Sequence, residues 1–273
     1  MLGSPEVREV SKIQDVLPLL CDPLTHEALQ ATQTDLGVTE LRAQIAGHMF
    51  PIDHGVPVML QSEDAAGSNA KYQSLYDKFA PFYDLAIAAF ALTKSGGVKK
   101  RRREYLRELE IREGSRVLEV SVGTGLNLRF LPTTAKYYGL DISKGMLRRC
   151  QRNLARWGRD AFLVQGAAEH LPFVDKAFDA VLHMGGVNFF SDKAAALRDM
   201  VRVAKPGAKI VVVDETQKLT RRFSKTPLAE GFYADGEASA VAPVQFLPLG
   251  VQDVRVRSIA KGDLYCLTFR APN

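Results

Sequence analysis

Short apolar runs alternate with amphipathic segments through the middle of the chain, and this alternation restricts the fold more than any other feature. Five runs are typical of strands: 116–121, 137–142, 161–166, 179–184 and 208–215. Helical patterns lie between them, at 126–131, 143–157 and 192–204, and Ser143 is the expected N-cap of the second. This order predicts an α/β fold with a doubly wound, mostly parallel sheet covered by helices on both faces.

Different patterns flank this region. Residues 253–270 form two strand-like runs around a Gly-Asp turn, which predicts a C-terminal antiparallel hairpin at one edge of the sheet. Near the N-terminus, short apolar segments are punctuated by Pro and Gly, which predicts a small β-rich domain. We therefore expect a small domain over 1–62, a linker over 63–70 and a main domain over 71–273.

Composition narrows the class of protein. The chain of 273 residues has three cysteines, Cys21, Cys150 and Cys266, which are far apart and odd in number, so we expect no disulfide framework. The first residues lack a basic segment followed by an apolar one, and no apolar run approaches the ~18 residues that span a bilayer. These features predict a cytoplasmic protein. The net charge of +5 permits anionic partners without requiring them.

A loop of small residues follows the first strand, and an acidic residue lies inside that strand. Glu119 is followed by Ser121, Gly123 and Gly125. Open parallel sheets bind ligands at the carboxyl ends of their strands, and glycine lets the backbone approach a ligand closely. A dinucleotide-binding loop would carry a third glycine where Leu128 stands. The pattern is instead acid-x-small-x-Gly-x-Gly.

This pattern resembles motif I of the class I S-adenosylmethionine (SAM) methyltransferases. Asp141 lies 18 residues after Gly123, at the end of the second strand. The segments 166–173, 178–184 and 200–215 resemble later motifs of the same family, in the right order and spacing. The resemblance covers about 100–215. It implies SAM as the cofactor and a methyltransferase activity.

The resemblance also implies the residues that contact the cofactor. Asp141 would accept both ribose hydroxyls, Glu119 would approach the amino end of SAM, and the loop 121–125 would wrap the methionine part. The implied cofactor-binding residues are Glu119, Ser121, Gly123, Gly125, Asp141, Ile142, Ala168, Glu169, His183, Tyr83 and Asp84.

Two positions depart from the family pattern. Ser121 stands where the family usually has glycine, and Ala167 stands where it often has an aspartate that binds the adenine amino group. We expect Ser121 to narrow the loop, and backbone groups or Glu169 to bind the adenine.

The segment before the sheet is rich in aromatic residues and predicts a helix with a turn at Pro81. Its sequence YDKFAPFYD, residues 76–84, resembles the lid that precedes the core of quinone C-methyltransferases and related enzymes. In such enzymes the lid covers SAM and the acceptor. The resemblance favours a role in the site for Tyr83 and Asp84, whereas we expect Tyr72 to pack in the core.

Methyl transfer from a sulfonium mainly requires that a nucleophile be held in line with the methyl group, in the absence of water. A base helps only when the acceptor carries a proton. His183, at the end of the fourth strand, is the candidate base, or alternatively a residue that positions SAM. Asn188 is expected to orient the acceptor, and Tyr83 is the third candidate catalytic residue. Asp214 and Glu215, at the end of the fifth strand, either line the pocket or lie at a solvated strand end, and we expect the second.

The acceptor is restricted mainly by what the sequence lacks. The Asn/Asp-Pro-Pro-aromatic motif of the N-methylases is absent after strand four, and neither Cys150 nor Cys266 is placed for RNA C5 methylation. The basic run at 99–103 begins a charged helix over 98–111 and is expected to be solvated. The core also resembles bacterial phospholipid N-methyltransferases. We therefore expect a small-molecule or lipid-like acceptor and unlikely use of nucleic acid, and leave open a peripheral membrane contact. RNA or protein docked on the N-terminal domain, and a SAM-binding scaffold without turnover, remain alternatives.

The N-terminal domain resembles the small zinc-ribbon-like domain that activates some tRNA and protein methyltransferases. The resemblance is carried by FPIDHGVP, residues 50–57. Metal-binding members use two Cys pairs, whereas Cys21 stands alone here and His26, His48 and His54 lack a recognised ligand spacing. We expect no structural zinc and no other metal. The domain would then be a clamp over the catalytic mouth or a structural support.

Overall fold

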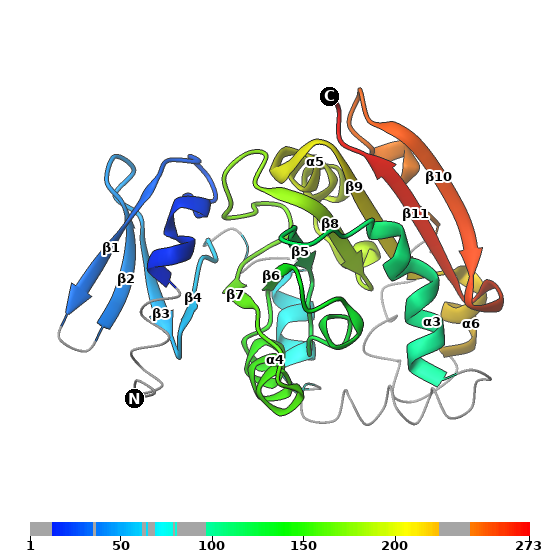
Figure 1. Cartoon of the computed structure of the whole chain (residues 1–273), viewed down its shortest axis with the longest axis horizontal. Coiled ribbons are helices and arrows are strands. Elements are labelled where there is room, and N and C mark those ends of the chain that lie inside the picture. Colours follow the sequence, from blue (N-terminus) through cyan, green and yellow to red (C-terminus); the bar gives the residue numbers. More distant parts are fainter. Residues whose placement is uncertain are drawn as a thin grey trace.

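The computed structural model of the chain describes residues 13–34, 37–61, 64, 69–78, 80, 97–223 and 241–273. Two sheets account for most of its strands: one of seven strands, in the order β10-β11-β9-β8-β5-β6-β7, and one of four, in the order β1-β2-β3-β4 (Figure 1). The strands of the large sheet are β5 (Arg116–Val120), β6 (Lys136–Asp141), β7 (Phe162–Gln165), β8 (Phe178–Met184), β9 (Ala204–Glu215), β10 (Gln252–Ile259) and β11 (Leu264–Arg270).

The large sheet confirms the predicted fold class. Strands β5 to β9 pair in parallel, and β11 pairs antiparallel with both β9 and β10, so the C-terminal hairpin forms one edge. The chain runs outward from β5 through β6 to β7 and then returns to β8 on the other side of β5. The strand order therefore reverses beside β5, and ligands of open α/β sheets bind at such a switch point.

Four helices have defined bounds: α3 (Gly97–Leu106), α4 (Lys144–Trp157), α5 (Lys193–Val203) and α6 (Gln217–Phe223). Residues 13–16 and 69–78 are also helical. As predicted, Ser143 caps α4, because its hydroxyl oxygen accepts a hydrogen bond from the backbone N–H of Met146. Short 3-10 turns complete the described helical segments: Leu17–Leu19, Arg107–Leu109, Leu128–Phe130, Val187–Phe189, Val244–Phe246 and Ala260–Gly262.

The predicted helix over 126–131 is wrong. Only Leu128–Phe130 forms a 3-10 turn, and Leu131 is already extended. Pro132 follows, and a proline disfavours helical backbone in the residue before it. Between Gly125 and Pro132 there is too little chain for a stable α-helix.

Apolar side chains alternate between the two faces of the sheet and build two cores. Val211 and Val213 of β9 join the core that holds α3, α4 and α6, whereas Ile210 and Val212 join the core that holds α5. This alternation follows from the two-residue period of a strand. The core that holds α5 also contains side chains of the N-terminal part, including Leu20 and Phe50.

The N-terminal part, which we call the N-terminal unit and define as residues 13–34, 37–61 and 64, carries the small antiparallel sheet. Its strands are β1 (Leu29–Thr34), β2 (Gly37–Ala43), β3 (Met49–Asp53) and β4 (Val56–Pro57). This confirms the predicted β-rich segment. The unit lies against β7, the edge strand of the large sheet (Figure 1), and Val58 pairs in parallel with Gln165.

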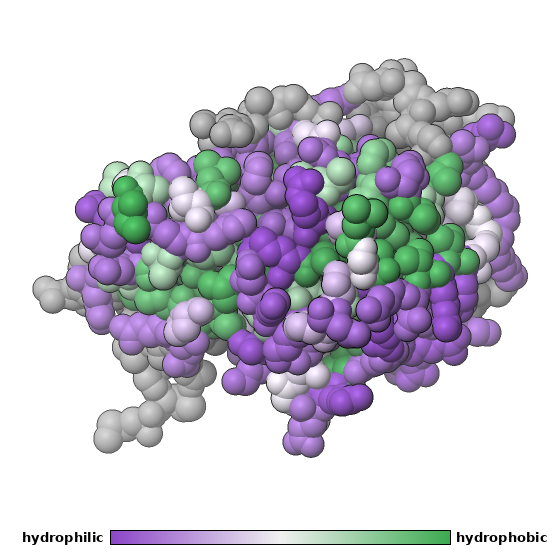
Figure 2. All heavy atoms as spheres, turned by 90° about the horizontal axis from the view of Figure 1, so that it is seen from above, coloured by the Kyte–Doolittle hydropathy of each residue, from purple (hydrophilic) through white to green (hydrophobic). Residues whose placement is uncertain are grey.

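The described helices and the molecular surface can be compared with what the sequence predicts about membrane contact. None of the helices in the described ranges combines the length and apolar character needed to cross a bilayer. Figure 2 shows an apolar area over the C-terminal part of the chain, where Val244, Phe246 and Leu249 are exposed. These residues precede β10, which runs in the same direction as β9, so the area lies at the amino edge of the parallel strands, away from the switch point.

Candidate active site

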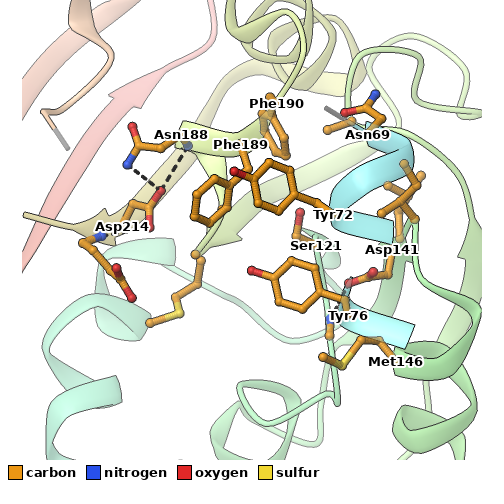
Figure 3. Close-up of a pocket in the computed structure, with 18 of the residues that line it drawn as sticks. Asn69, Tyr72, Tyr76, Ser121, Asp141, Met146, Asn188, Phe189, Phe190 and Asp214 are labelled. Atoms are coloured by element: carbon orange, nitrogen blue, oxygen red, sulfur yellow. Dashed lines mark hydrogen bonds between the residues drawn. The ribbon is translucent and has the colours of Figure 1, made fainter. Parts of the chain in front are cut away.

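A cleft opens at the carboxyl ends of β5, β6 and β8, where the strand order reverses (Figure 3). The sheet and the loops after its strands form one wall, and the helix over 69–78 forms the other. Of the described residues, those that line the cleft are Asn69, Tyr72, Tyr76, Ser121, Gly123, Leu140, Asp141, Ile142, Met146, Gly166, Ala168, Glu169, Met184, Gly185, Gly186, Asn188, Phe189, Phe190, Asp214, Glu215, Thr220 and Leu264.

Asp141 ends β6 and holds two loops in place at the cleft. One carboxylate oxygen accepts from the backbone N–H of Gly123 at 2.8 Å, and the other accepts from the N–H of Ser143 at 2.9 Å. Burial is the largest influence on its pKa, which it raises to about 6. Because each carboxylate oxygen has two lone pairs, both oxygens can accept a further hydrogen bond from a ligand.

The loop after β5 has a backbone that glycine adopts easily and serine does not. Gly123 has φ +54°, and a Cβ built on it would meet nothing within 4 Å. Ser121 has φ +58°, a left-handed conformation that strains a residue with a side chain. Both residues line the cleft. The departure from glycine at position 121 is therefore accommodated with backbone strain.

Gly125 has a different reason to be glycine. A Cβ at this position would lie 2.7 Å from the sulfur of Cys150, on α4, and φ is +76°. Gly125 is not among the described residues that line the cleft. Its contribution to the site is close packing of the loop against α4, and direct contact with a cofactor stays a prediction.

Glu119 is buried on β5 beneath the loop. One of its oxygens accepts from the side-chain N–H of Asn127 at 2.5 Å, and the other has no partner in the part of the chain that the structure describes. Burial raises the pKa of Glu119 to about 8, so the side chain is mostly protonated at neutral pH. Glu119 does not reach the cleft wall formed by the described residues.

The basic run at 99–103 is only partly solvated, which corrects our expectation. Arg102 turns inward and donates to the hydroxyl of Tyr105 at 3.0 Å and to the side-chain oxygen of Asn127. Arg101 lies 3.7 Å from Asp263. Through Arg102, α3 is therefore hydrogen-bonded to Asn127, which also bonds Glu119. The charge of the run alone did not predict this role.

His183 was expected to face the cleft, but the structure buries it completely. Its Nδ1 lies 3.2 Å from the carbonyl oxygen of Val120, which can only accept, so Nδ1 carries the proton and Nε2 keeps its lone pair. Nε2 has no partner among the described residues. Burial lowers the pKa to about 4. Phe190, whose ring centre is 5.0 Å from the imidazole, lines the cleft instead.

The loop after β8 carries Asn188 into the cleft and is held by two carboxylates. Asp214 accepts from the backbone N–H and the side-chain amide of Asn188 at 3.4 and 3.3 Å (Figure 3). Glu169 accepts from the N–H groups of Ser191 and Asp192 at 2.9 and 3.3 Å. We expected Asp214 at a solvated strand end, which is wrong: it is buried, and burial raises its pKa. It lines the cleft, which was the alternative.

The helix over 69–78 supplies residues that the sequence analysis missed or misplaced. Tyr72 and Tyr76 point into the cleft (Figure 3), and Tyr72, which we expected in the core, stacks on Phe189 with ring centres 4.3 Å apart. Asp77 accepts from the hydroxyl of Ser143 at 2.6 Å and from the N–H of Gly145 at 2.7 Å. Asp77 thereby joins the helix to the start of α4.

The other predictions for this segment lie beyond what the structure describes. Tyr83 and Asp84 fall outside the described residues. The signal for Asp77 was present in the sequence, because Tyr76-Asp77 is the first of the two Tyr-Asp pairs in the lid-like segment. Within the described ranges, no group of three or more His, Cys, Asp or Glu is placed to hold a metal ion.

Comparisons with known proteins agree with this geometry. A family profile described as "Methyltransferase domain" matches residues 118–212, the part that carries the loop after β5, Asp141 and the strands on both sides of the cleft. Residues 118–212 are therefore similar to methyltransferase domains. The methyl donor of such domains is SAM.

Curated relatives match about half of the chain. The chain is 34% identical over 152 residues to a demethylmenaquinone methyltransferase of Mycobacterium sp. (strain KMS) and 32% identical over 151 residues to one of Lactiplantibacillus plantarum. These matches cover 55% and 53% of this chain and 62% of each relative. The chain thus matches less than two thirds of the length of these relatives.

Solved structures share the fold of nearly three quarters of the chain. A chain from the complex between the Trm112 methyltransferase activator of Haloferax volcanii and a methyltransferase superposes with a TM-score of 0.57, at 16% identity, over 72% of this chain and 98% of that chain. The [4+2]-cyclase SpnF superposes with a TM-score of 0.58, at 16% identity, over 74% and 95%. These likenesses show the fold alone, and SpnF shows that the fold also serves other chemistry.

Proposed function

We propose that the chain transfers a methyl group from SAM to a small planar or lipid-like acceptor. Asp141 carries this proposal, because its carboxylate lines the cleft at the switch point and retains an acceptor site on each oxygen. Two ribose hydroxyls fit that arrangement. The open space beside Gly123 fits the methionine part of the cofactor.

The protein contributes to the reaction by holding SAM and the acceptor in place and by enclosing them in the cleft. SAM supplies an electrophilic methyl group when bound. Ser121, Gly123 and Asp141 would hold its methionine and ribose parts, while Ile142, Ala168 and Glu169 line the cleft further along. Tyr83 and Asp84 remain proposed contributors to this site. Glu119 and Gly125 do not line the cleft. They would act on the cofactor indirectly, by supporting the loop after β5.

The acceptor side of the cleft favours a planar, mostly apolar molecule. Tyr72, Phe189 and Phe190 present aromatic rings there, and Asn188 supplies a polar group among them. Aromatic rings bind planar ligands by offset stacking or edge contacts. The relatives named for demethylmenaquinone support the same class of acceptor. His183 is the proposed base for an acceptor that loses a proton, a role that requires its buried ring to become accessible from the cleft.

Calorimetry tests the cofactor half of the proposal. We expect the wild-type chain to bind S-adenosylhomocysteine, and Asp141→Asn to raise Kd at least about tenfold, because one charge-assisted acceptor becomes a donor. The matched control is Asp179→Asn, a carboxylate that bonds Arg116 N–H and Lys205 at the other end of the parallel strands. An equal Kd in all three proteins would contradict the proposal.

Methyl-labelled SAM tests the acceptor half. We expect the wild-type enzyme to label a reduced naphthoquinone and to leave tRNA and bulk protein unlabelled. Label in phosphatidylethanolamine vesicles would instead identify a phospholipid as the lipid-like acceptor. Label in tRNA or protein instead would favour a macromolecular substrate docked on the N-terminal unit. Binding of SAM without transfer to any of these acceptors would favour a SAM-binding scaffold.

A further inference from the structure

Residues 165–174 leave the edge strand β7 and contribute Gly166, Ala168 and Glu169 to the cleft. This segment has two sides with different neighbours. Its inner side lines the proposed cofactor site. Its outer side is contacted by the N-terminal unit, none of whose described residues lines the cleft.

The first contact lies at the start of the segment. The backbone N–H of Met59 donates to the carbonyl oxygen of Gln165 at 2.7 Å, and Val58 pairs with the same residue as a parallel bridge. The side chain of Gln165 is buried and donates to the carbonyl oxygen of Ile142 at 3.0 Å. Ile142 itself lines the cleft. Gln165 alone therefore links Met59 to a residue of the cleft wall.

The second contact lies at the end of the segment. The N–H of Cys21 donates to the carbonyl oxygen of Pro172 at 3.1 Å, and the N–H of Val174 donates to the carbonyl oxygen of Leu19 at 3.0 Å. Leu20 and Phe173 form an antiparallel bridge between these two bonds, and both side chains are buried. A short two-stranded pairing thus fixes the exit of the segment to the N-terminal unit.

The third contact lies in the middle. One carboxylate oxygen of Asp64 is 3.4 Å from Nδ1 of His170, directly after Glu169. Asp64 is only 3% exposed, and its other oxygen accepts from the N–H of Gln61 at 2.8 Å. The carboxylate is therefore fixed within the N-terminal unit and can position the histidine.

These contacts hold the segment at its start, middle and end. Ordering a loop on binding costs backbone entropy, so a loop that is already ordered binds its ligand more tightly than one that must order on binding. We propose that the N-terminal unit is an intramolecular clamp that holds residues 165–172 in their cofactor-binding conformation. Cofactor binding and local opening of the unit are then coupled. This inference rests on the proposed function, because it requires that SAM or its product binds the cleft.

Coupling is reciprocal, and this gives a test on the wild-type chain. Hydrogen exchange is measured with and without saturating S-adenosylhomocysteine, after calorimetry has shown binding. We expect the amides of Cys21 and Met59 to exchange at least about fivefold more slowly with ligand. The amide of Ala271, which donates to Ala208 at the far end of the sheet, reports global opening and should slow less.

The outcomes separate the clamp from the proposed function. Binding of S-adenosylhomocysteine with unchanged exchange at Cys21 and Met59, or with equal slowing at Ala271, would overturn the clamp and leave the proposed function intact. Failure of the wild-type chain to bind S-adenosylhomocysteine would overturn the proposed function and the clamp together.

A pair of conservative variants tests the central contact. Asp64→Asn weakens the contact with His170, and we expect Kd for S-adenosylhomocysteine to rise about threefold or more and exchange at residues 166–170 to accelerate. Asp53→Asn is the matched control: Asp53 belongs to the same unit, but it pairs with Lys144 of α4 at 2.9 Å and not with residues 166–174. A purely structural role would lower the stability of both variants without changing Kd. An unchanged Kd in Asp64→Asn, or an equal rise in Asp53→Asn, would overturn the clamp.

Discussion

Glu119 allows a prediction about stability that depends only on the buried environment of one carboxyl group. Burial raises its pKa from the usual 4.5 to about 8, against the smaller opposing effects of Asn127 and Arg102. The folded chain therefore holds this proton more tightly than the unfolded chain. The proton's contribution to stability is complete below about pH 4.5 and is lost as the pH rises to about 8.

The size of the effect follows from the shift. Between the two pKa values, stability falls by about 1.4 kcal/mol for each pH unit. From pH 5.5 to 7.5 the loss attributable to Glu119 is therefore about 2–3 kcal/mol. Glu119→Gln removes the titration and keeps an oxygen that accepts from Asn127. The amide of this variant has one more hydrogen-bond donor than a protonated carboxyl group. Burying that donor without a partner lowers stability by about 1 kcal/mol at every pH.

Urea unfolding at several pH values between 5.5 and 7.5 measures this slope. Fluorescence of Trp157, the chain's single tryptophan, reports on unfolding around α4. We expect the stability of the wild type to fall more steeply with pH than that of Glu119→Gln, by about 2–3 kcal/mol over the range. The exposed Glu113→Gln serves as control and should follow the wild type. Parallel pH profiles for wild type and Glu119→Gln would refute the reasoning.

Three further variants test other parts of the site. Ser121→Gly should raise the free energy of unfolding by about 0.5–1 kcal/mol, because glycine adopts the left-handed backbone at φ +58° without strain. Thermal unfolding measures this, and an unchanged or lower Tm would show that the strain is absent. Tyr72→Ala should raise KM for a planar acceptor about fivefold or more and leave Kd for SAM unchanged, and equal effects on both would contradict its place on the acceptor side. Asp77→Ala should lower stability by about 1 kcal/mol through loss of its bonds at the start of α4; an unaltered urea midpoint would argue against that contact.

The elements that sequence predicted best are those encoded by neighbouring residues. Apolar runs of four to eight residues gave the strands of the parallel sheet, and the hydroxyl of Ser143 marked the start of α4. The misjudged helix near 126–131 shows how weak a six-residue pattern is when Pro132 follows it. Ser121, Gly123, Asp141, Ala168 and Glu169 were assigned to the site by the resemblance to class I SAM methyltransferases, and all of them line the cleft at the strand ends.

The missed features all depend on contacts between distant segments. Asp77 meets Ser143 across 66 positions of sequence, and Arg102 reaches Asn127 across 25. The burial of Asp214 depends on the return of the loop with Asn188 over the strand end. His183 was correctly placed at the end of its strand, but it is fully buried, and the ring of Phe190 packs against it. Local patterns contain no information on such packing.

A crystal structure of the full chain with S-adenosylhomocysteine tests the central claim most directly. We predict the nucleoside in the cleft beside β5 and β6, with both ribose hydroxyl oxygens at about 2.5–3.0 Å from the carboxylate of Asp141. The bonds from Gly123 and Ser143 to the same carboxylate should persist. A nucleoside bound elsewhere, or a ribose out of reach of Asp141, would contradict the account.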